Sequence, residues 1–215
     1  MARTSPLARR RLSLVLGCAA LLFLPSLPAH AQRTETLLGR RGVTDVGGFG
    51  GPVVKFSRLA GTDAVFSGGR GGLIVNRRLV LGGGGYGSLS ENIRTDYTFD
   101  DGSRPSLRLG YGGLELEYIM RPTRVVHGSI GLLIGGGVAR YETKTESANA
   151  VATQTLESTL FVAEPALNLE VNVTSWFRTG VGAGYRYVHG SDLPLAGDSQ
   201  LSAAVGTLFF RFGSF

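Results

Sequence analysis

The alternation of apolar and polar residues in segment 159–173 constrains the fold of this chain most strongly. Every second residue from Phe161 to Val173 is apolar, whereas the positions between them include Glu164 and Glu170. Because successive side chains of a strand point to opposite faces, this segment is predicted to be a strand with one apolar and one charged face. Comparable segments rich in Val, Leu, Phe, Tyr and Gly cover residues 45–59, 63–76, 79–88, 107–120, 126–141, 176–188 and 200–213. We therefore predict eight strands and no helix.

The connections between these segments alternate in length. The short ones cover residues 76–78, 121–124 and 174–175. The long and mostly polar ones cover residues 89–106, 142–158 and 189–199, and the short hairpin at 59–61 is the exception to the alternation. Tight turns at one end and long loops at the other are typical of outer-membrane barrels, whose turns lie in the periplasm.

The backbone restricts how such a chain can cross a membrane. After residue 31 no apolar stretch reaches the roughly 18 residues of a helical span, so helical spans are excluded. Lipid offers no hydrogen-bond partner to an open sheet edge, so a sheet that crosses a bilayer must close on itself. We predict an all-β fold: an eight-stranded antiparallel transmembrane up-and-down β-barrel of the outer-membrane type over residues 45–215. A soluble sandwich or a lipocalin-like barrel is the alternative.

The N-terminus has the three parts of a secretory signal peptide. Basic residues 1–11 precede a mostly apolar run, and Ala29-His30-Ala31 predicts cleavage before Gln32. A permanent transmembrane helix, a lipoprotein site at Cys18 and a twin-arginine signal are the competing interpretations. Removal of residues 1–31 leaves 18 basic and 16 acidic residues, which weakens a nucleic-acid role based on the high pI. Residues 32–44 are predicted to form a periplasmic segment or a short plug.

Charged residues fall on the polar face of several predicted strands. The positions assigned to the barrel lumen are Lys55, Arg70, Glu115, Glu117, Glu164, Glu170, Arg178, Arg186 and Arg211. An eight-stranded barrel is only wide enough for side chains to fill, and charges confined there must pair. The near balance of five cations and four anions predicts a charge-paired, closed lumen. In segment 107–120 the apolar parity changes midway, which predicts a bulge near Gly112-Gly113.

Aromatic residues concentrate toward the predicted ends of the strands, as they do in the aromatic girdles of membrane barrels. Those assigned to the turn side are Tyr118, Trp176, Phe177, Phe210 and Phe212. Those assigned to the loop side are Phe56, Phe66, Tyr86, Tyr141, Phe161, Tyr185 and Tyr187.

Sequence motifs for catalysis, metals and nucleotides are sparse. Gly82, Gly84 and Gly87 match a dinucleotide-binding spacing, but no helical pattern follows them, so no nucleotide cofactor is expected. With two histidines and no cysteine after residue 31, no metal site is expected. His189 and Ser191 lie two residues apart, which places them on one face of an extended segment.

The His-x-Ser spacing resembles that of outer-membrane lipid A deacylases, which use a Ser nucleophile, a His base and an orienting Glu. This chain departs from them, since Asp192 follows the serine where they have Asn. Residues 201–215 also contain no acid, so Asp198 is the nearby substitute for the orienting Glu.

Nearly all of the mature chain resembles small eight-stranded outer-membrane proteins of the OmpA/OmpX barrel class. Its segments GGFGGPVVKF (47–56), GGRGGLIVN (68–76), LGGGGYG (81–87), GYRYVHG (184–190) and LFFRFGSF (208–215) resemble a Gly-rich barrel family of Bacteroidota-type bacteria. That family has no established activity, so the resemblance implies a fold and no chemistry. It also implies that the terminal aromatic, Phe215, is the signal that the barrel-assembly machinery reads.

These observations predict a non-enzymatic protein integral to the bacterial outer membrane, with an envelope-structural or surface-interaction role. The alternatives are a lipid A deacylase-like or phospholipid hydrolase that uses His189 and Ser191, and a narrow channel or small-solute conduit. The expected partners are outer-membrane lipid, lipopolysaccharide and, during biogenesis, the barrel-assembly machinery. We expect a monomer with no cofactor, no nucleic acid and no nucleotide.

Overall fold

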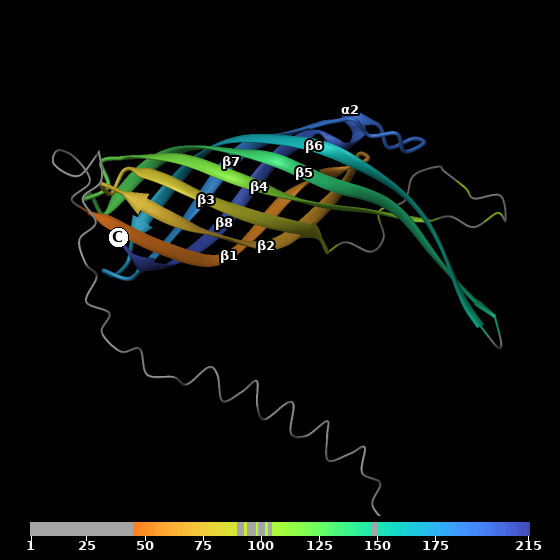
Figure 1. Ribbon diagram of the computed structural model, residues 1–215, viewed down its shortest axis with the longest axis horizontal. Helices are drawn as coiled ribbons and strands as arrows, with labels where there is room; N and C mark the ends of the chain where they lie inside the picture. Colours follow the sequence, from red (N-terminus) through yellow and green to blue (C-terminus); the bar gives the residue numbers. More distant parts are fainter. Residues whose placement is uncertain (1–44, 90–92, 94–97, 99–101, 103–104, 148–149) are drawn as a thin grey trace, which may run out of the picture. The chain divides into compact units, whose positions relative to one another are not determined.

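The computed structural model describes residues 45–89, 93, 98, 102, 105–147 and 150–215. These residues form a closed antiparallel barrel in which each strand pairs with the next and the last pairs with the first (Figure 1). The strands are β1 (Val46–Leu59), β2 (Thr62–Val75), β3 (Leu79–Ser88), β4 (Ser106–Met120), β5 (Val126–Ser147), β6 (Ala150–Asn172), β7 (Phe177–His189) and β8 (Ala203–Ser214). The predicted eight-stranded up-and-down topology is confirmed, whereas the predicted signal peptide and segment 32–44 lie outside the described residues.

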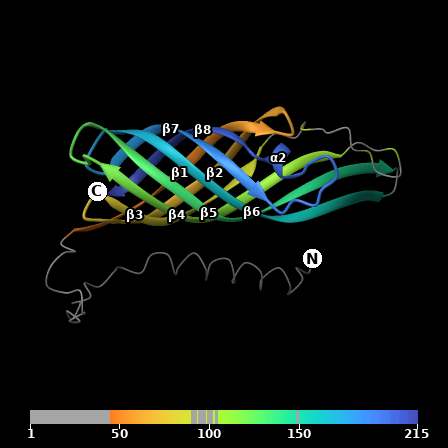
Figure 2. The same ribbon diagram turned by 90° about the horizontal axis from the view of Figure 1, so that it is seen from above.

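Closure occurs between β1 and β8. Their register runs from Gly48 opposite Ser214 to Ser57 opposite Val205, so the first strand has a partner on both sides. A closed ladder leaves no sheet edge with unpaired N–H and C=O groups along the wall. The short connections after β2, β4 and β6 lie at one end of the barrel, which we call the turn end. We call the opposite end, where α2 lies, the loop end (Figure 2).

The β5–β6 hairpin is longer than the sequence pattern predicts. The predicted loop at 142–158 is wrong over most of its length, because the two strands stay paired from Glu142 opposite Thr155 to Ser147 opposite Ala150. Both strands run past their other neighbours at the loop end (Figure 1). This stretch contains four Thr, a residue that favours strands, but it lacks the alternation of apolar and polar residues that marks a half-buried strand.

The prediction of no helix is also wrong. A single helical turn, α2 (Asp198–Leu201), lies between β7 and β8. Such a short turn has no periodic sequence signal, and its tertiary contacts hold it in place. Leu201 is buried, and the backbone N–H of Ala60 donates to the carbonyl of Gln200 at 2.9 Å. Among the described residues no helix is long and apolar enough to cross a membrane.

The interior of the barrel changes character along its axis. A large apolar cluster fills the loop end and includes Leu59, Phe66, Leu107, Tyr141 and Leu201. A smaller cluster fills the turn end and consists of Phe49, Ile74, Val80 and Ile119, with Phe215 packed against it. The ion-paired side chains of the lumen lie between these two clusters.

This layered interior explains why the predicted bulge in β4 is absent. Pairing of β4 with β5 is continuous from Ser106 opposite Glu142 to Met120 opposite Gly128. Leu107, Leu109 and Tyr111 face inward and are buried in the loop-end cluster. The apolar parity changes because the lumen changes from apolar to charged, while the strand itself remains regular.

The outer wall is apolar and exposed. Leu114 and Leu167 are 69% and 62% exposed. Further outward apolar side chains, 41–55% exposed, occur in every strand. They include Leu73, Leu81, Leu116, Ile130, Ile134, Leu169 and Val181. An apolar band of this extent is unfavourable in water and is the lipid-facing surface of a membrane barrel. It argues against the soluble alternative.

Candidate functional site: the charged lumen

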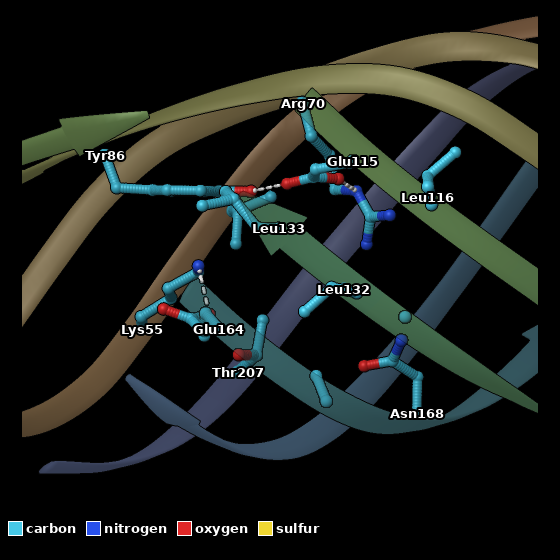
Figure 3. A pocket seen from close by; sticks show the side chains of 13 residues that line it. Lys55, Arg70, Tyr86, Glu115, Leu116, Leu132, Leu133, Glu164, Asn168 and Thr207 are labelled. Carbon is cyan, nitrogen blue, oxygen red and sulfur yellow. Dashed lines mark hydrogen bonds and ion pairs between the residues drawn. The ribbon is translucent and has the colours of Figure 1, made fainter. Parts of the chain in front are cut away.

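The first part of the charged lumen joins β1 to β6 across the barrel. Lys55 Nζ lies 2.6 Å from Glu164 Oε1 (Figure 3). The Tyr111 hydroxyl donates to Glu164 Oε2 at 2.6 Å. The same ammonium group lies 3.4 Å from the centre of the Tyr86 ring. Lys55 and Glu164 are both almost fully buried, so each depends on the other for its charge to be tolerated there.

The second part continues as an alternating chain of acids and bases. Arg70 contacts Glu115 at 2.8 Å and Glu117 at 2.5 Å. Arg211 contacts Glu117 at 2.6 Å and Glu170 at 3.1 Å. The chain therefore joins side chains from β2, β4, β6 and β8. The Tyr86 hydroxyl, which donates to Glu115 at 2.5 Å, lies between the two parts of the network.

The two remaining inward cations have no carboxylate partner among the described residues. Arg186 donates to the carbonyls of Leu201 at 2.9 Å and Arg58 at 2.8 Å, so it ties the last loop to the first hairpin. Arg178 is buried near the turn end, with its guanidinium carbon 3.9 Å from the centre of the Phe215 ring. All nine charged residues assigned to the lumen thus lie inside it, and seven of them make ion pairs there.

Two polar residues of the lumen, His127 and Ser129, were not predicted from the sequence. His127 Nε2 lies 3.7 Å from Glu170, and Ser129 donates to Glu170 at 3.2 Å. The amide of Asn168 donates to Ser129 at 3.2 Å. His127 and Ser129 alternate with the outward residues of β5, so their polar parity was the available signal. An assignment of the lumen by formal charge alone does not include them.

A cavity of about 40 Å³ remains in the lumen. Figure 3 shows its lining, which includes Lys55, Arg70, Glu115 and Glu164. Because a water molecule occupies roughly 10–15 Å³ on this measure, the cavity has room for a few ordered waters between the charged groups. Within the described residues, three or more His, Asp or Glu side chains are nowhere grouped so that they could hold a metal ion.

The aromatic girdle is partly as predicted and partly wrong. Phe66, Tyr86 and Tyr141 are buried inside the barrel, because they lie on the inward parity of their strands. The predicted positions that are exposed on the outer wall are Phe56, Tyr118, Phe161, Trp176, Tyr185, Tyr187 and Phe212. Phe177 and Phe210 are partly exposed and stack with their centres 6.4 Å apart. These three rings lie toward the loop end, as predicted, but they face the lumen and not the lipid.

His189 and Ser191 do not form a hydrogen-bonded pair. His189 Nδ1 instead lies 3.0 Å from Asp198, and the Ser191 hydroxyl donates to the carbonyl of Ala196 at 2.7 Å. Strand β7 ends at His189, and Gly190 has a φ of +91°, so the extended geometry that would align the two side chains stops there. A hydrogen bond from the Ser191 backbone N–H is the main influence that lowers the pKa of Asp198.

Comparison with known proteins does not assign the chain to a protein family. No protein-family model matches the chain, and no curated protein does. Among solved structures, Neisserial surface protein A is 11% identical, with 81% of this chain and 99% of that chain covered and a TM-score of 0.44. Ail of Yersinia pestis, in complex with the heparin analogue sucrose octasulfate, is 12% identical over 78% and 97% of the chains, with a TM-score of 0.43. The N-terminal β-barrel domain of Pseudomonas aeruginosa OprF is 13% identical over 80% and 99%, with a TM-score of 0.38. At such identities the likeness concerns the fold alone.

Proposed function

We propose that this chain is an integral protein of the bacterial outer membrane whose barrel is sealed, and that it serves an envelope-structural or surface-interaction role without catalysis. The observation that carries this proposal is the two-part network of ion pairs that crosses the lumen. One part pairs Lys55 with Glu164, and the other joins Arg70, Glu117 and Arg211. A packed and neutralised interior stabilises the barrel and leaves the loops as the surface available to partners.

Two features support a sealed lumen over a conduit. The cavity between the charged groups is about 40 Å³, which is far below the volume of a solute path. At the loop end the apolar cluster closes over the charges, and the Tyr141 hydroxyl donates to the carbonyl of Pro194 at 2.7 Å, so the last loop is tied down over it. A conduit would require both features to be displaced.

The outer wall and the N-terminal sequence support the proposed location. The exposed apolar band requires lipid, and residues 1–31 have the composition of an export signal. Assembly machinery that reads Phe215 would place the turn end in the periplasm and the loops outside, in contact with lipopolysaccharide. Cell fractionation tests this: the mature chain is expected in the outer-membrane fraction, with heat-modifiable gel migration. A freely dissolved periplasmic monomer would refute the proposal.

Hydrolysis of lipid acyl groups is a second candidate, favoured by the contact between His189 and Asp198. The imidazole is already oriented by a carboxylate, as a general base requires. The hydroxyl of Ser191 would have to leave the carbonyl of Ala196 to reach it. Incubation of the protein with lipid A separates the two functions. Acyl release that is lost in Ser191→Ala supports hydrolysis, and no release from the unmodified protein eliminates it.

A further inference from the structure

We propose that three arginines at the turn end, Arg78, Arg121 and Arg124, bind the phosphate groups of anionic phospholipids in the leaflet that surrounds that end. We call these three residues the arginine arc, because they lie in the β2–β3 and β4–β5 turns, on one side of the barrel. The inference names a lipid partner and rests on the proposed membrane location.

The backbone of the arc is held in place by neighbouring strands. The side-chain amide of Asn172 donates to the carbonyls of Pro122 at 3.1 Å and Arg124 at 2.7 Å, so β6 fixes the β4–β5 turn. The backbone N–H of Ile119 donates to the carbonyl of Arg78 at 2.7 Å, so β4 fixes the β2–β3 turn. The guanidinium groups therefore project from preorganised turns, which reduces the entropy lost when a ligand binds.

The charge of the arc is not neutralised by the protein. Arg77, in the same β2–β3 turn, pairs with Asp45 at 2.6 Å, but Arg78, Arg121 and Arg124 have no carboxylate partner among the described residues. The outward arginines of the loop end differ in this respect. Their pairs are Arg58 with Asp63 at 3.1 Å, Arg108 with Glu142 at 3.2 Å, and Arg140 with Glu157 at 3.5 Å. The turn end thus keeps a local excess of positive charge on one side.

The depth of the arc identifies a lipid as its ligand. Leu79, Met120 and Val126, which face outward within two residues of an arc arginine, are 41–52% exposed. One residue of strand spans about 3.3 Å, so the guanidinium groups stand at the edge of the hydrocarbon layer, at the level of headgroup phosphates. Arginine binds phosphate through parallel N–H donors, and the cost of desolvating it is lower than for lysine.

The opposite side of the turn end supplies an internal comparison. There Trp176, Phe177 and Phe212 stack on the outer wall with ring centres 5.0–6.1 Å apart, and the β6–β7 turn carries no charged residue. Aromatic rings anchor a barrel at the interface without selecting a headgroup charge. The preference for anionic lipid should therefore be confined to the side of β2–β5.

Tryptophan quenching by brominated lipids in mixed bilayers tests this, because Trp176 is the only tryptophan of the chain. The unmodified protein reports the lipid beside the aromatic side, and the double variant Trp176→Phe/Val126→Trp moves the reporter to the arginine arc. We expect brominated phosphatidylglycerol to be preferred over brominated phosphatidylcholine about fivefold or more at the arc and not at Trp176. Met120→Trp provides a second reporter should Val126→Trp fail to fold.

Charge variants complete the experiment. Changing Arg78, Arg121 and Arg124 to Gln should abolish the preference at the arc reporter. The matched control changes Arg58, Arg108 and Arg140 to Gln, removes the same charge at the loop end, and should leave the preference intact. Equal quenching by both lipids in an inserted, heat-modifiable protein would overturn this inference alone. Failure of the protein to insert into bilayers would overturn the proposed function together with it.

Discussion

Each buried, ion-paired residue of the lumen depends on the partner that compensates its charge. Glu117 accepts from both Arg70 and Arg211, so it links two cations that would otherwise repel each other. Parity along the strands predicted that these three residues face inward, since period-two alternation reports the face of a strand. Which carboxylate meets which guanidinium was not predictable, because it depends on the stagger between strands that are distant in sequence.

Replacement of Glu117 by Gln should therefore destabilise the folded barrel strongly. Removing one member of a buried network leaves its partners uncompensated, a loss of about 3–5 kcal/mol in the free energy of unfolding. Urea titration of the protein in lipid vesicles measures it. The control is Glu157→Gln, whose ion pair with Arg140 is exposed and should contribute less than about 1 kcal/mol. Equal losses in both variants would contradict a buried network.

The carboxylate of Asp198 gives a pH-dependent signal at the loop end. Its pKa is lowered by the hydrogen bond from the Ser191 backbone N–H, so the stabilisation that this bond provides is present above the ordinary aspartate pKa and is lost as the pH falls through the lowered value. In NMR spectra the Ser191 amide signal should titrate with a midpoint below about 3.9. Asp198→Asn should remove the titration. A midpoint at or above the ordinary value would contradict the assigned hydrogen bond.

At the scale of elements, the sequence predicts strands well wherever their two faces differ. The alternation of β6 predicts its membrane-spanning part. The extensions of β5 and β6 beyond the pair Glu142–Thr155 lack contrast between their faces, so the sequence pattern predicts a loop there. The prediction of a bulge in β4 was wrong for a different reason, which concerns the loop-end half of the strand. Its inward residues Leu107 and Leu109 are as apolar as lipid-facing ones, so composition could not tell the interior from the exterior.

Glycine allows β4 and β5 to approach closely at one point. Gly113 lies opposite Gly135, and a Cβ atom on Gly135 would collide with the carbonyl oxygen of Gly112 and the Cα of Gly113. We expect Gly135→Ala to lower the free energy of unfolding by about 1–3 kcal/mol, because backbone atoms on both strands would have to shift. The control is Gly85→Ala, where a Cβ meets no atom within 4 Å. Unchanged stability in Gly135→Ala would show that the strands are farther apart.

At the scale of the whole molecule, the barrel has three interior layers within an apolar wall. Ion pairs occupy the middle, and the apolar clusters close over them at either end. The charged lumen was predictable in part, because the near-equal numbers of inward cations and anions implied that they pair. The loop-end cluster was predictable only in part, because Leu193 and Leu201 from the connection between β7 and β8 join its strand residues, and no strand periodicity specifies their positions.

Electrical recording of the folded protein in planar bilayers tests the sealed interior most directly. Insertion is verified independently by heat-modifiable migration, and a known pore reconstituted in the same way serves as the positive control. Because the charges pair across the lumen and the cavity among them is only about 40 Å³, we predict no steady conductance. Sustained conductance steps from verified, inserted protein would show that the lumen is open and would contradict the account.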